Sequence, residues 1–520
     1  MLSCPAGVTR TMSSSLQRGY AALQARNVPE AIQWFERALG ENPEDIQAMS
    51  WLGQTLCSVG RRTEGSERLR GSGRRLLETA RLSGDLKPVL DIAQQMQQWG
   101  DFAGAHELLE QAAAINDGEF RVFQMLAVTR AQLNKTAAAL DAGRRAAAML
   151  PANSMMQILL ASLEADAGLN EAARDRLEAA LTSPLEPREA FRAHKELARV
   201  LDKLKAYDRV FSHLHASANL SVSLPEYAQQ NPALLPNMIR ANTAGFDRDL
   251  MGRWSGTAFP PELPPPVFLV GFFRSGTTLA QEVLGAHSGV QVADEADFVW
   301  AMQRELHQMV GGNEGTADKL RKLDHAGILR LRAFYWNRVR DRFGDAVGGS
   351  RLVDKFTLNT LDLGLINTVF PDAKLIFVLR DPRDVCLSCF MQLMVPSPAT
   401  VHLLSWQGTA DFYAMVMAWW RHIRPQLTMD VIEFRYEDAV VQFEPTFRRV
   451  FDALGLAWDD DVKRFHEHAA NKHIASPSRT QVAQPLYASS VGRWQHYKAE
   501  FAPVAGTLEP FIAAFGYAPF

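Results

Sequence analysis

The sequence has little cysteine and no long apolar run, and each of these absences excludes a class of protein. Only four cysteines, Cys4, Cys57, Cys386 and Cys389, are spread over 520 residues, which is too few for a disulfide framework and favours a reducing compartment. The N-terminus lacks the apolar stretch of a signal peptide, although Met12 is an alternative start. No later segment approaches the roughly 18 apolar residues of a spanning helix. We therefore expect a cytoplasmic protein without membrane contact.

An excess of charge of one sign is lacking as well. The 55 basic and 58 acidic residues leave a net charge of -3, so nucleic acid is not expected as a partner. A hydrophobic content of 47% with 22% charged residues is typical of globular domains, and at roughly 150 residues per domain the length predicts two to four of them. Any anion site must therefore be built by a local group of basic residues.

A repeat runs through the first part of the chain. Small residues recur at Gly19, Gly53, Ala93, Ala127 and Ala161, with gaps of 34, 40, 34 and 34 residues. A period of 34 resembles that of tetratricopeptide repeats, which are pairs of antiparallel helices. The same frame aligns further packing residues and helix-stopping prolines, namely Ala31, Phe35, Ala38, Pro43, Ala105, Leu109, Ala112, Ala139, Ala146, Pro151, Ala173, Leu177 and Ala180. One more unit contains Leu197, Ala198, Tyr207 and Leu214, and the unit at Gly53, with its Gly/Arg-rich tail, is degenerate.

The repeats predict an all-α solenoid over residues 12–219. Stacked helix pairs commonly bind peptide segments, so we expect this part to recruit a protein or peptide. The alternative is a structural cap or a dimerisation element, which would make the protein a homo-oligomer. Residues 220–263 break the period with proline and glycine and predict a linker.

A phosphate-binding loop is predicted after the linker. Residues 267–270 form an apolar run typical of a buried parallel strand, a glycine loop follows, and helical spacing resumes beyond it. This order directs backbone N–H groups and a helix N-terminus at one anion. The spacing from Gly271 to Gly276 is that of a Walker A loop, but Thr277 replaces the lysine and Arg274 supplies the charge instead. The candidate ligands are Gly271, Arg274, Ser275, Gly276, Thr277 and Thr278.

A second anion site is predicted at the end of another strand. Residues 375–379 are apolar, Arg380 follows at the carboxyl end, and Ser388 lies on the next predicted helix. Because ligands of open α/β sheets collect at the carboxyl ends of the strands, Arg380 and Ser388 should converge on a second phosphate. Asp381 and Arg383 are interpreted as a salt-bridged turn.

Both motifs resemble those of sulfotransferases. FLVGFFRSGTTL is similar to the 5'-phosphosulfate loop, with Arg274 as in the protein-tyrosine sulfotransferases, and KLIFVLRDPRDVCLSCF is similar to the 3'-phosphate motif. The resemblance implies that 3'-phosphoadenosine 5'-phosphosulfate (PAPS) is the sulfuryl donor. It also implies a P-loop-like α/β domain with a parallel sheet over residues 264–520, and thus an α + α/β multidomain protein.

The resemblance also implies catalytic roles. Glu295 matches the general base, with Ala293 a small departure from the family's glycine, and Lys355 matches the lysine that stabilises the leaving oxygen. Arg274 completes this set. Of the remaining candidates, Tyr436 would lie near the nucleotide, and Ser478 and Arg493 match contacts to the 3'-phosphate and ribose. His287 is a rival base, although it is better explained as a cation that caps the preceding helix.

The predicted activity is sulfuryl transfer from PAPS to a hydroxyl, with a tyrosine of a protein or peptide as the leading acceptor. No metal is expected, since the arginines and the lysine supply positive charge. Two alternatives remain, namely a kinase that uses the same loop and a catalytically silent peptide-binding adaptor.

Overall fold

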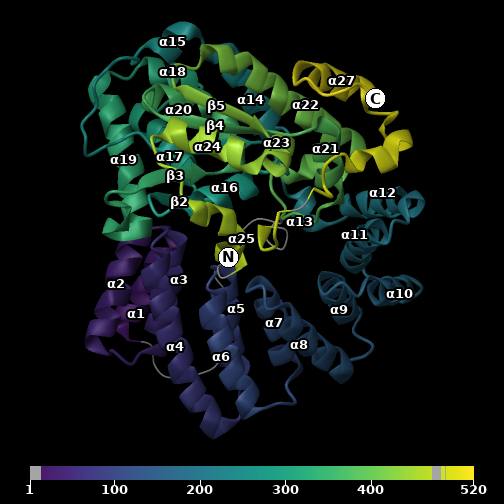
Figure 1. Cartoon of the computed structure of the whole chain (residues 1–520). Coiled ribbons are helices and arrows are strands. Elements are labelled where there is room, and N and C mark those ends of the chain that lie inside the picture. The colour runs from purple at the N-terminus through teal and green to yellow at the C-terminus, as the bar shows by residue number, and fades with distance from the viewer. Residues whose placement is uncertain (1–12, 471–481, 487) are drawn as a thin grey trace. The chain divides into compact units, whose positions relative to one another are not determined.

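The computed structural model describes residues 13–470, 482–486 and 488–520, and Figure 1 shows its course. It divides into two compact units, Met1–Ala173 and Arg174–Phe520. The division lies inside the predicted repeat region, whereas the domain boundaries at residues 219 and 263 stay a prediction.

The first unit consists of helices that follow one another in pairs, as the period predicts. They are α1 (Ser14–Gln24), α2 (Val28–Glu41), α3 (Ile46–Ser58), α4 (Arg62–Ser83), α5 (Lys87–Gln98), α6 (Phe102–Ile115), α7 (Phe120–Gln132), α8 (Thr136–Met149) and α9 (Ser154–Asp166), while α10 (Asn170–Leu181) spans the division. A Cβ atom at Gly19 would lie 2.4 Å from the ring of Phe35, so the small residue lets α1 and α2 approach. Ala93, Ala127 and Ala161 are fully buried. The predicted solenoid is confirmed.

The gap of 40 residues after Gly53 has a structural cause. Helices α2, α6 and α8 have 14 residues each, whereas α4 has 22. The Gly/Arg-rich tail of this repeat is therefore helical and simply extends α4. Gly53 and Gly65 let α3 and α4 pack closely, because a Cβ atom at either residue would lie under 3.0 Å from the other's carbonyl oxygen.

Helices also fill the start of the second unit. They are α11 (Pro187–Lys203), α12 (Val210–Ser221), α13 (Pro225–Ala228), α14 (Leu234–Gly245) and α15 (Arg248–Gly252). Asn242 of α14 donates a hydrogen bond to the carbonyl of Leu361 (2.9 Å), and Asn367 donates one to the carbonyl of Met251 (2.9 Å). These buried amides fasten the segment before the sheet to the sheet domain.

A five-stranded parallel sheet forms the centre of the second unit (Figure 1). Its strands are β1 (Val267–Gly271), β2 (Val290–Asp294), β3 (Arg351–Lys355), β4 (Lys374–Leu379) and β5 (Asp430–Arg435), in the order β2-β3-β1-β4-β5. Leu269 packs in a cluster with α16 and α24, whereas its neighbour Phe268 contacts Tyr335 of α19 and Phe370. Helices therefore cover both faces, as expected for an α/β domain.

The remaining elements of this unit surround the sheet. The α-helices are α16 (Thr277–Gly285), α17 (Phe298–Val310), α18 (Thr316–Arg321), α19 (His325–Phe343), α20 (Leu363–Val369), α21 (Pro382–Met391), α22 (Trp406–Ile423), α23 (Tyr436–Val441), α24 (Phe443–Leu454), α25 (Phe465–Ala470) and α27 (Ala505–Ala514). The 3-10 helices are η1 (Tyr207–Arg209), η2 (Gly344–Val347), η3 (Thr357–Asp362), η4 (Thr400–Leu404), η5 (Arg424–Gln426), η6 (Asp460–Arg464) and η7 (Arg493–Phe501). In the part of the chain that the structure describes, no helix has the length and apolar character needed to cross a membrane.

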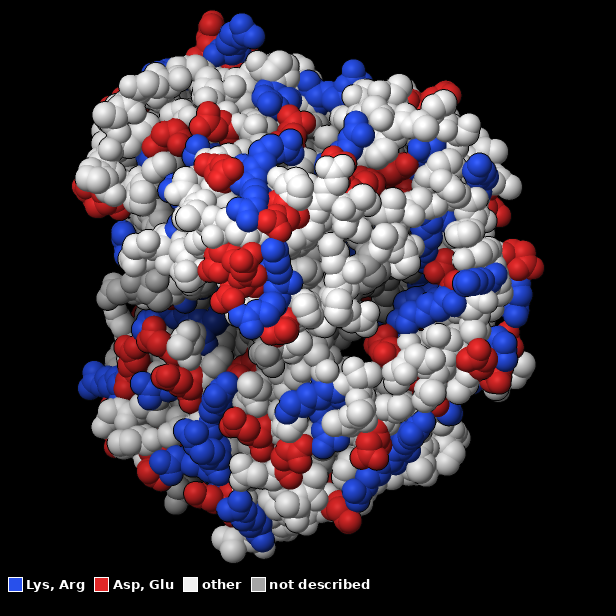
Figure 2. Space-filling model, in the orientation of Figure 1, with Lys and Arg blue, Asp and Glu red and all other residues white. Residues whose placement is uncertain are grey.

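The surface shows the balance of charge that the composition predicts. Basic and acidic side chains are interspersed over the face drawn in Figure 2.

Candidate active site

The predicted phosphate loop connects β1 to α16 in a strained conformation. Arg274 has φ +63° and Gly276 has φ +104°, and positive φ is uncommon for a residue with a side chain. Gly276 is required for a second reason, because a Cβ atom there would lie 2.4 Å from the ring of Tyr436. Such strain persists where the surroundings impose it and is concentrated at functional sites.

The loop presents polar groups that suit an anion. Gly276 precedes α16 and makes no side-chain cap hydrogen bond, and the N–H groups at a helix N-terminus can bind an anionic ligand. The buried hydroxyl of Ser275 has no hydrogen-bond partner within the described residues. Thr277, in contrast, shares a hydrogen bond with the hydroxyl of Thr357 (3.1 Å) and fixes the loop to the segment after β3.

An open pocket lies beside the loop. Seven of the predicted site residues line it, namely Arg274, Gly276, Thr278, Arg380, Ser388, Tyr436 and Arg493. The pocket therefore joins the two anion motifs predicted from distant parts of the sequence, and three of its lining residues are arginines.

Direct contacts join the two motifs. Nε of Arg274 donates to the hydroxyl of Ser388 (3.0 Å), and Nη1 of Arg380 donates to the carbonyl oxygen of Arg274 (3.0 Å). Arg380 also lies over the ring of Tyr436, at 4.6 Å from its centre, and donates to the carbonyl of Ser490 (2.6 Å). The hydroxyls of Tyr436 and Ser490 are 2.8 Å apart. Ser490 was missed, although it lies between the predicted ligands Ser478 and Arg493 in the sequence.

Asp381 and Arg383 form the predicted salt-bridged turn. Nε and Nη2 of Arg383 donate to the two carboxylate oxygens of Asp381 (2.9 and 2.8 Å), and Arg383 is buried. Its guanidinium stacks on the ring of Trp494, at 3.8 Å from the centre, and Trp494 is itself buried. These residues pack the C-terminal segment against α21.

The predicted catalytic pair lies at the carboxyl ends of β2 and β3. Asp294 pairs with Lys355 in the sheet register, and Glu295 follows with φ +46°. Nζ of Lys355 donates to Oε1 of Glu295 and to Oδ1 of Asp294, the latter at 3.4 Å. Burial lowers the pKa of Lys355, but the adjacent carboxylates outweigh it and raise the pKa above its ordinary value. The lysine therefore stays charged.

Glu295 and Lys355 adjoin the loop without lining the pocket described above. Lys355 is also the register partner of Leu269, two residues before the loop begins. Beyond Lys355, Thr360 donates to the carbonyl of Gly271 (2.7 Å). Gly271, Ser275 and Thr277 are buried and packed together, because a Cβ atom at Gly271 would lie 2.7 Å from Oγ of Ser275 and 3.2 Å from the methyl group of Thr277.

Asp354 is a buried carboxylate that sequence reasoning missed. It precedes Lys355 on β3, is fully buried, and accepts a hydrogen bond from the hydroxyl of Tyr335 (2.8 Å). Burial raises the pKa of Asp354 to about 7. The sequence signal for Asp354 is a charged residue at an inward-facing position of a strand whose neighbouring residues are apolar.

His287 has a structural role that differs from the expected helix-capping cation. Its Nδ1 accepts from the backbone N–H of Gly289 (2.9 Å), so Nε2 carries the proton and donates to the carbonyl of Ala457 (2.9 Å). The ring also stacks on Phe451. Both nitrogens are occupied, and the ring ties the end of α16 to the segment after α24.

One predicted ligand, Ser478, and the two cysteines of α21 remain to be described. Ser478 lies outside the described residues. Cys386 and Cys389 are buried thiols, and burial raises the pKa of Cys389 to about 12. Among the described residues, no three His, Cys, Asp or Glu side chains are grouped so as to hold a metal ion.

Comparison with known proteins identifies the segment that holds these motifs. Residues 265–460 match the sulfotransferase family. Residues 12–56 match the tetratricopeptide repeat. The chain is therefore similar to a tetratricopeptide-repeat sulfotransferase, as the sequence predicts.

Relatives of the chain include two animal proteins. The chain is 26% identical to the protein-tyrosine sulfotransferase of Drosophila melanogaster over 284 residues, which cover 49% of this chain and 52% of that protein. It is 23% identical to protein-tyrosine sulfotransferase 2 of Gallus gallus over 276 residues, 49% of this chain and 70% of that one. An uncharacterized protein of Aquifex aeolicus is 28% identical over 342 residues, 64% of this chain and 43% of its own. The chain thus spans about half of the length of the Drosophila protein and less than half of the Aquifex one.

Among solved structures, the sulfotransferase domain from the curacin biosynthetic pathway aligns with 49% of this chain and 99% of its own, at 16% identity and a TM-score of 0.36. The structure reported in a functional characterization of Pseudomonas aeruginosa pilF aligns with 42% of this chain and 94% of its own, at 16% identity and a TM-score of 0.28.

Proposed function

We propose that the protein transfers a sulfuryl group from PAPS to a hydroxyl acceptor. One observation carries the proposal: the pocket brings together both anion motifs, with Arg274 of the first bonded to Ser388 of the second. PAPS has two anionic ends, and two separate basic sites on one pocket fit such a donor. The match of residues 265–460 to the sulfotransferase family supports the same reaction.

In this proposal the loop holds the 5'-phosphosulfate. The N–H groups at the start of α16, the hydroxyls of Ser275 and Thr278, and the guanidinium of Arg274 would stabilise its negative charge. Arg380 and Ser388 would bind the 3'-phosphate, with Tyr436 and Arg493 beside the nucleotide, and Ser478 is a further ligand of this part. A fork of guanidinium donors suits a phosphate.

The transfer itself would use the pair at the end of β2 and β3. Glu295 accepts the proton of the acceptor hydroxyl, whose oxygen bonds to sulfur as the bond from sulfur to the 5'-phosphate oxygen breaks. Lys355 stabilises the charge on that leaving oxygen, and adenosine 3',5'-bisphosphate (PAP) is released. Lys355 contacts Oε1 of Glu295, so Oε2 is the oxygen to receive the proton. Arginine and lysine supply the positive charge in this scheme, without a metal.

The proposed acceptor is a tyrosine of a protein or peptide that the repeat helices recruit. The names of the Drosophila and Gallus relatives support a tyrosine acceptor, and the tetratricopeptide match supports a peptide partner. A kinase is disfavoured, because the residue at the Walker lysine position, Thr277, is bonded to Thr357.

The experiment is incubation of the full chain with sulfate-labelled PAPS and either a tyrosine peptide or a lysate of its own host, with the label located by mass spectrometry. We expect label on a tyrosine hydroxyl. Glu295→Gln should lower turnover by about 10²–10⁴-fold, as removal of a general base does. Glu305→Gln, at a partly buried carboxylate paired with Arg330, is the matched control. Binding of PAP without transfer to any acceptor would instead identify a silent adaptor.

A further inference from the structure

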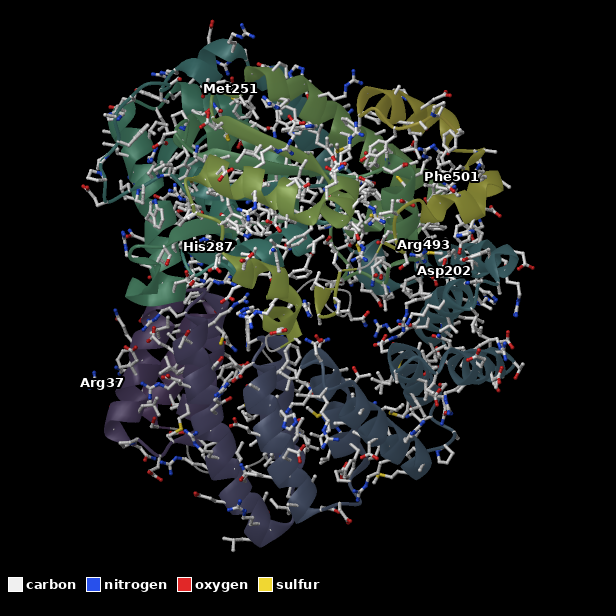
Figure 3. All side chains as sticks on the ribbon, in the orientation of Figure 1. Arg37, Asp202, Met251, His287, Arg493 and Phe501 are labelled. Atoms are coloured by element: carbon white, nitrogen blue, oxygen red, sulfur yellow. The ribbon has the colours of Figure 1, made fainter. Side chains whose placement is uncertain are left out.

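Asp202, near the end of α11, the first helix of the last repeat pair, contacts a residue of the pocket. Nε and Nη2 of Arg493 bind its two carboxylate oxygens, at 3.0 and 2.7 Å, and the hydroxyl of Tyr497 donates to the first oxygen (2.6 Å). The side chains of Asp202 and Arg493 are only 13% and 26% exposed. Figure 3 shows the two residues side by side. They are separated by 291 residues in the sequence, so only the fold brings them together.

The contacts leave one arm of Arg493 for a ligand. A guanidinium has five N–H groups, of which Nε carries one and each Nη two. Nε and Nη2 bind Asp202, and Nη2 also contacts the sulfur of Met391 (2.8 Å). Within the described residues, Nη1 has no partner, and Arg493 lines the pocket. The carboxylate thus fixes one edge of the planar fork and leaves Nη1 to bind an anion.

The backbone around Arg493 is fixed by a second carboxylate. Asp384 of α21 accepts hydrogen bonds from the N–H of Gly492 (2.7 Å) and from that of Trp494 (2.9 Å), one on each side of Arg493. Asp384 is buried. The main chain of Arg493 is therefore positioned by the sulfotransferase segment, whereas its side chain is oriented by helix α11.

We propose that Asp202 is a positioning residue for the donor: it orients Arg493 so that Nη1 binds the 3'-phosphate end of the nucleotide. The inference rests on the proposed function. It makes helix α11 a part of the donor site, and it explains why a carboxylate lies beside a pocket for an anion. The negative charge of Asp202 lowers the positive potential of the pocket, whereas its hydrogen bonds restrict Arg493 to one orientation.

The two effects of Asp202 predict opposite results, which makes the proposal testable on the full chain. We expect Asp202→Asn to weaken PAP binding about tenfold, the loss expected for hydrogen bonds to a charged group, and to leave AMP, which lacks the 3'-phosphate, nearly unchanged. Calorimetry gives both dissociation constants. If Asp202 acted only through its charge, the substitution would tighten both ligands, and the proposal would be wrong.

Matched variants separate positioning from other causes. Asp208→Asn makes the same change of charge six residues further on, at an exposed site, and should leave both constants unchanged. Asp202→Glu should restore part of the PAP preference. Arg493→Ala should lose the preference as well, and Asp202→Asn added to it should cause no further loss.

The outcomes also separate this inference from the proposed function. Should the unmodified protein show no preference for PAP over AMP, the proposed donor is wrong and the inference fails with it. Should it show the preference and Asp202→Asn keep it, only the role of Asp202 is overturned. A purely structural contact would lower the unfolding temperature of Asp202→Asn and leave the ratio of the two constants intact.

Discussion

Two sets of repeat helices follow one sequence period and differ in what they contact. In α5–α8 of the first unit, small and apolar residues such as Ala93 and Ala127 pack into one continuous core. In α11 and α12 of the second unit, Lys195 donates to the carbonyl of Phe390, and Phe211 packs on the rings of Phe390 and Trp406. The same period thus serves internal packing in one set and attachment to the sulfotransferase segment in the other. A repeat register alone does not determine the role of a helix pair.

The largest effect is expected from a comparison of two truncations, one that keeps α11 and α12 and one that removes α11 and most of α12. Removing residues 1–169 ends the deletion before α10 and keeps Glu178, which pairs with Arg209 at 2.6 Å, so PAP binding should survive within about threefold. Removing residues 1–219 also deletes Asp202 and uncovers Phe390, and PAP binding should fall by at least about tenfold. Calorimetry on both products measures this. Equal affinities would show that α11 and α12 contribute nothing to the donor site.

A smaller effect is expected when one buried alanine in each set of repeat helices is replaced by a larger residue. Ala127 in α7 and Ala198 in α11 are both fully buried, and replacing either with leucine should cost about 1–3 kcal/mol through overpacking. Ala198→Leu should also weaken PAP binding severalfold, because it displaces the helix that bears Asp202, whereas Ala127→Leu should not. Urea unfolding and calorimetry test the pair. If Ala127→Leu weakened PAP binding and Ala198→Leu did not, α7 rather than α11 would support the PAP site, and the account would be wrong.

The smallest expected effect concerns the pH dependence of stability at Lys195. Burial lowers the pKa of Lys195 from 10.5 to about 7 in the folded protein. Between these values the unfolded chain binds more protons than the folded one, so the free energy of unfolding rises with pH, by at most about 1.4 kcal/mol per unit. As the pH falls towards 7 this stability is lost. Lys195→Met should abolish the rise.

The comparison uses urea unfolding at several pH values, with Lys203→Met, an exposed residue of the same helix, as the control. Lys203→Met should retain the slope of the unmodified protein. An unchanged slope in Lys195→Met would mean that the amine titrates normally.

The sequence predicted those parts of the fold that depend on local patterns. The 34-residue period indicated the helix pairs, and the strand, glycine loop and helix order indicated β1 and α16. Arg380 and Ser388 could be predicted to lie at one site, because the carboxyl ends of parallel strands meet at the same edge of the sheet. The sequence alone does not distinguish the long helix α4 from a degenerate repeat, because either one interrupts the 34-residue period.

Contacts between distant segments could not be predicted. Asp202 and Asp384 act on the segment around Arg493, and nothing near either residue indicates that partner. The role of His287 also required the structure, because the protonation of its ring depends on Gly289 and Ala457. Sequence patterns therefore located the motifs that line the pocket, whereas the residues that contact them from distant segments became visible only in the fold.

The most direct test of the account is calorimetry of the full chain with PAP and with AMP, repeated on Arg380→Ala. The account predicts that PAP binds at least about tenfold more tightly than AMP, because a second phosphate gains charge-assisted hydrogen bonds, and that Arg380→Ala removes this difference. Equal affinities for the two nucleotides in the unmodified protein would contradict it.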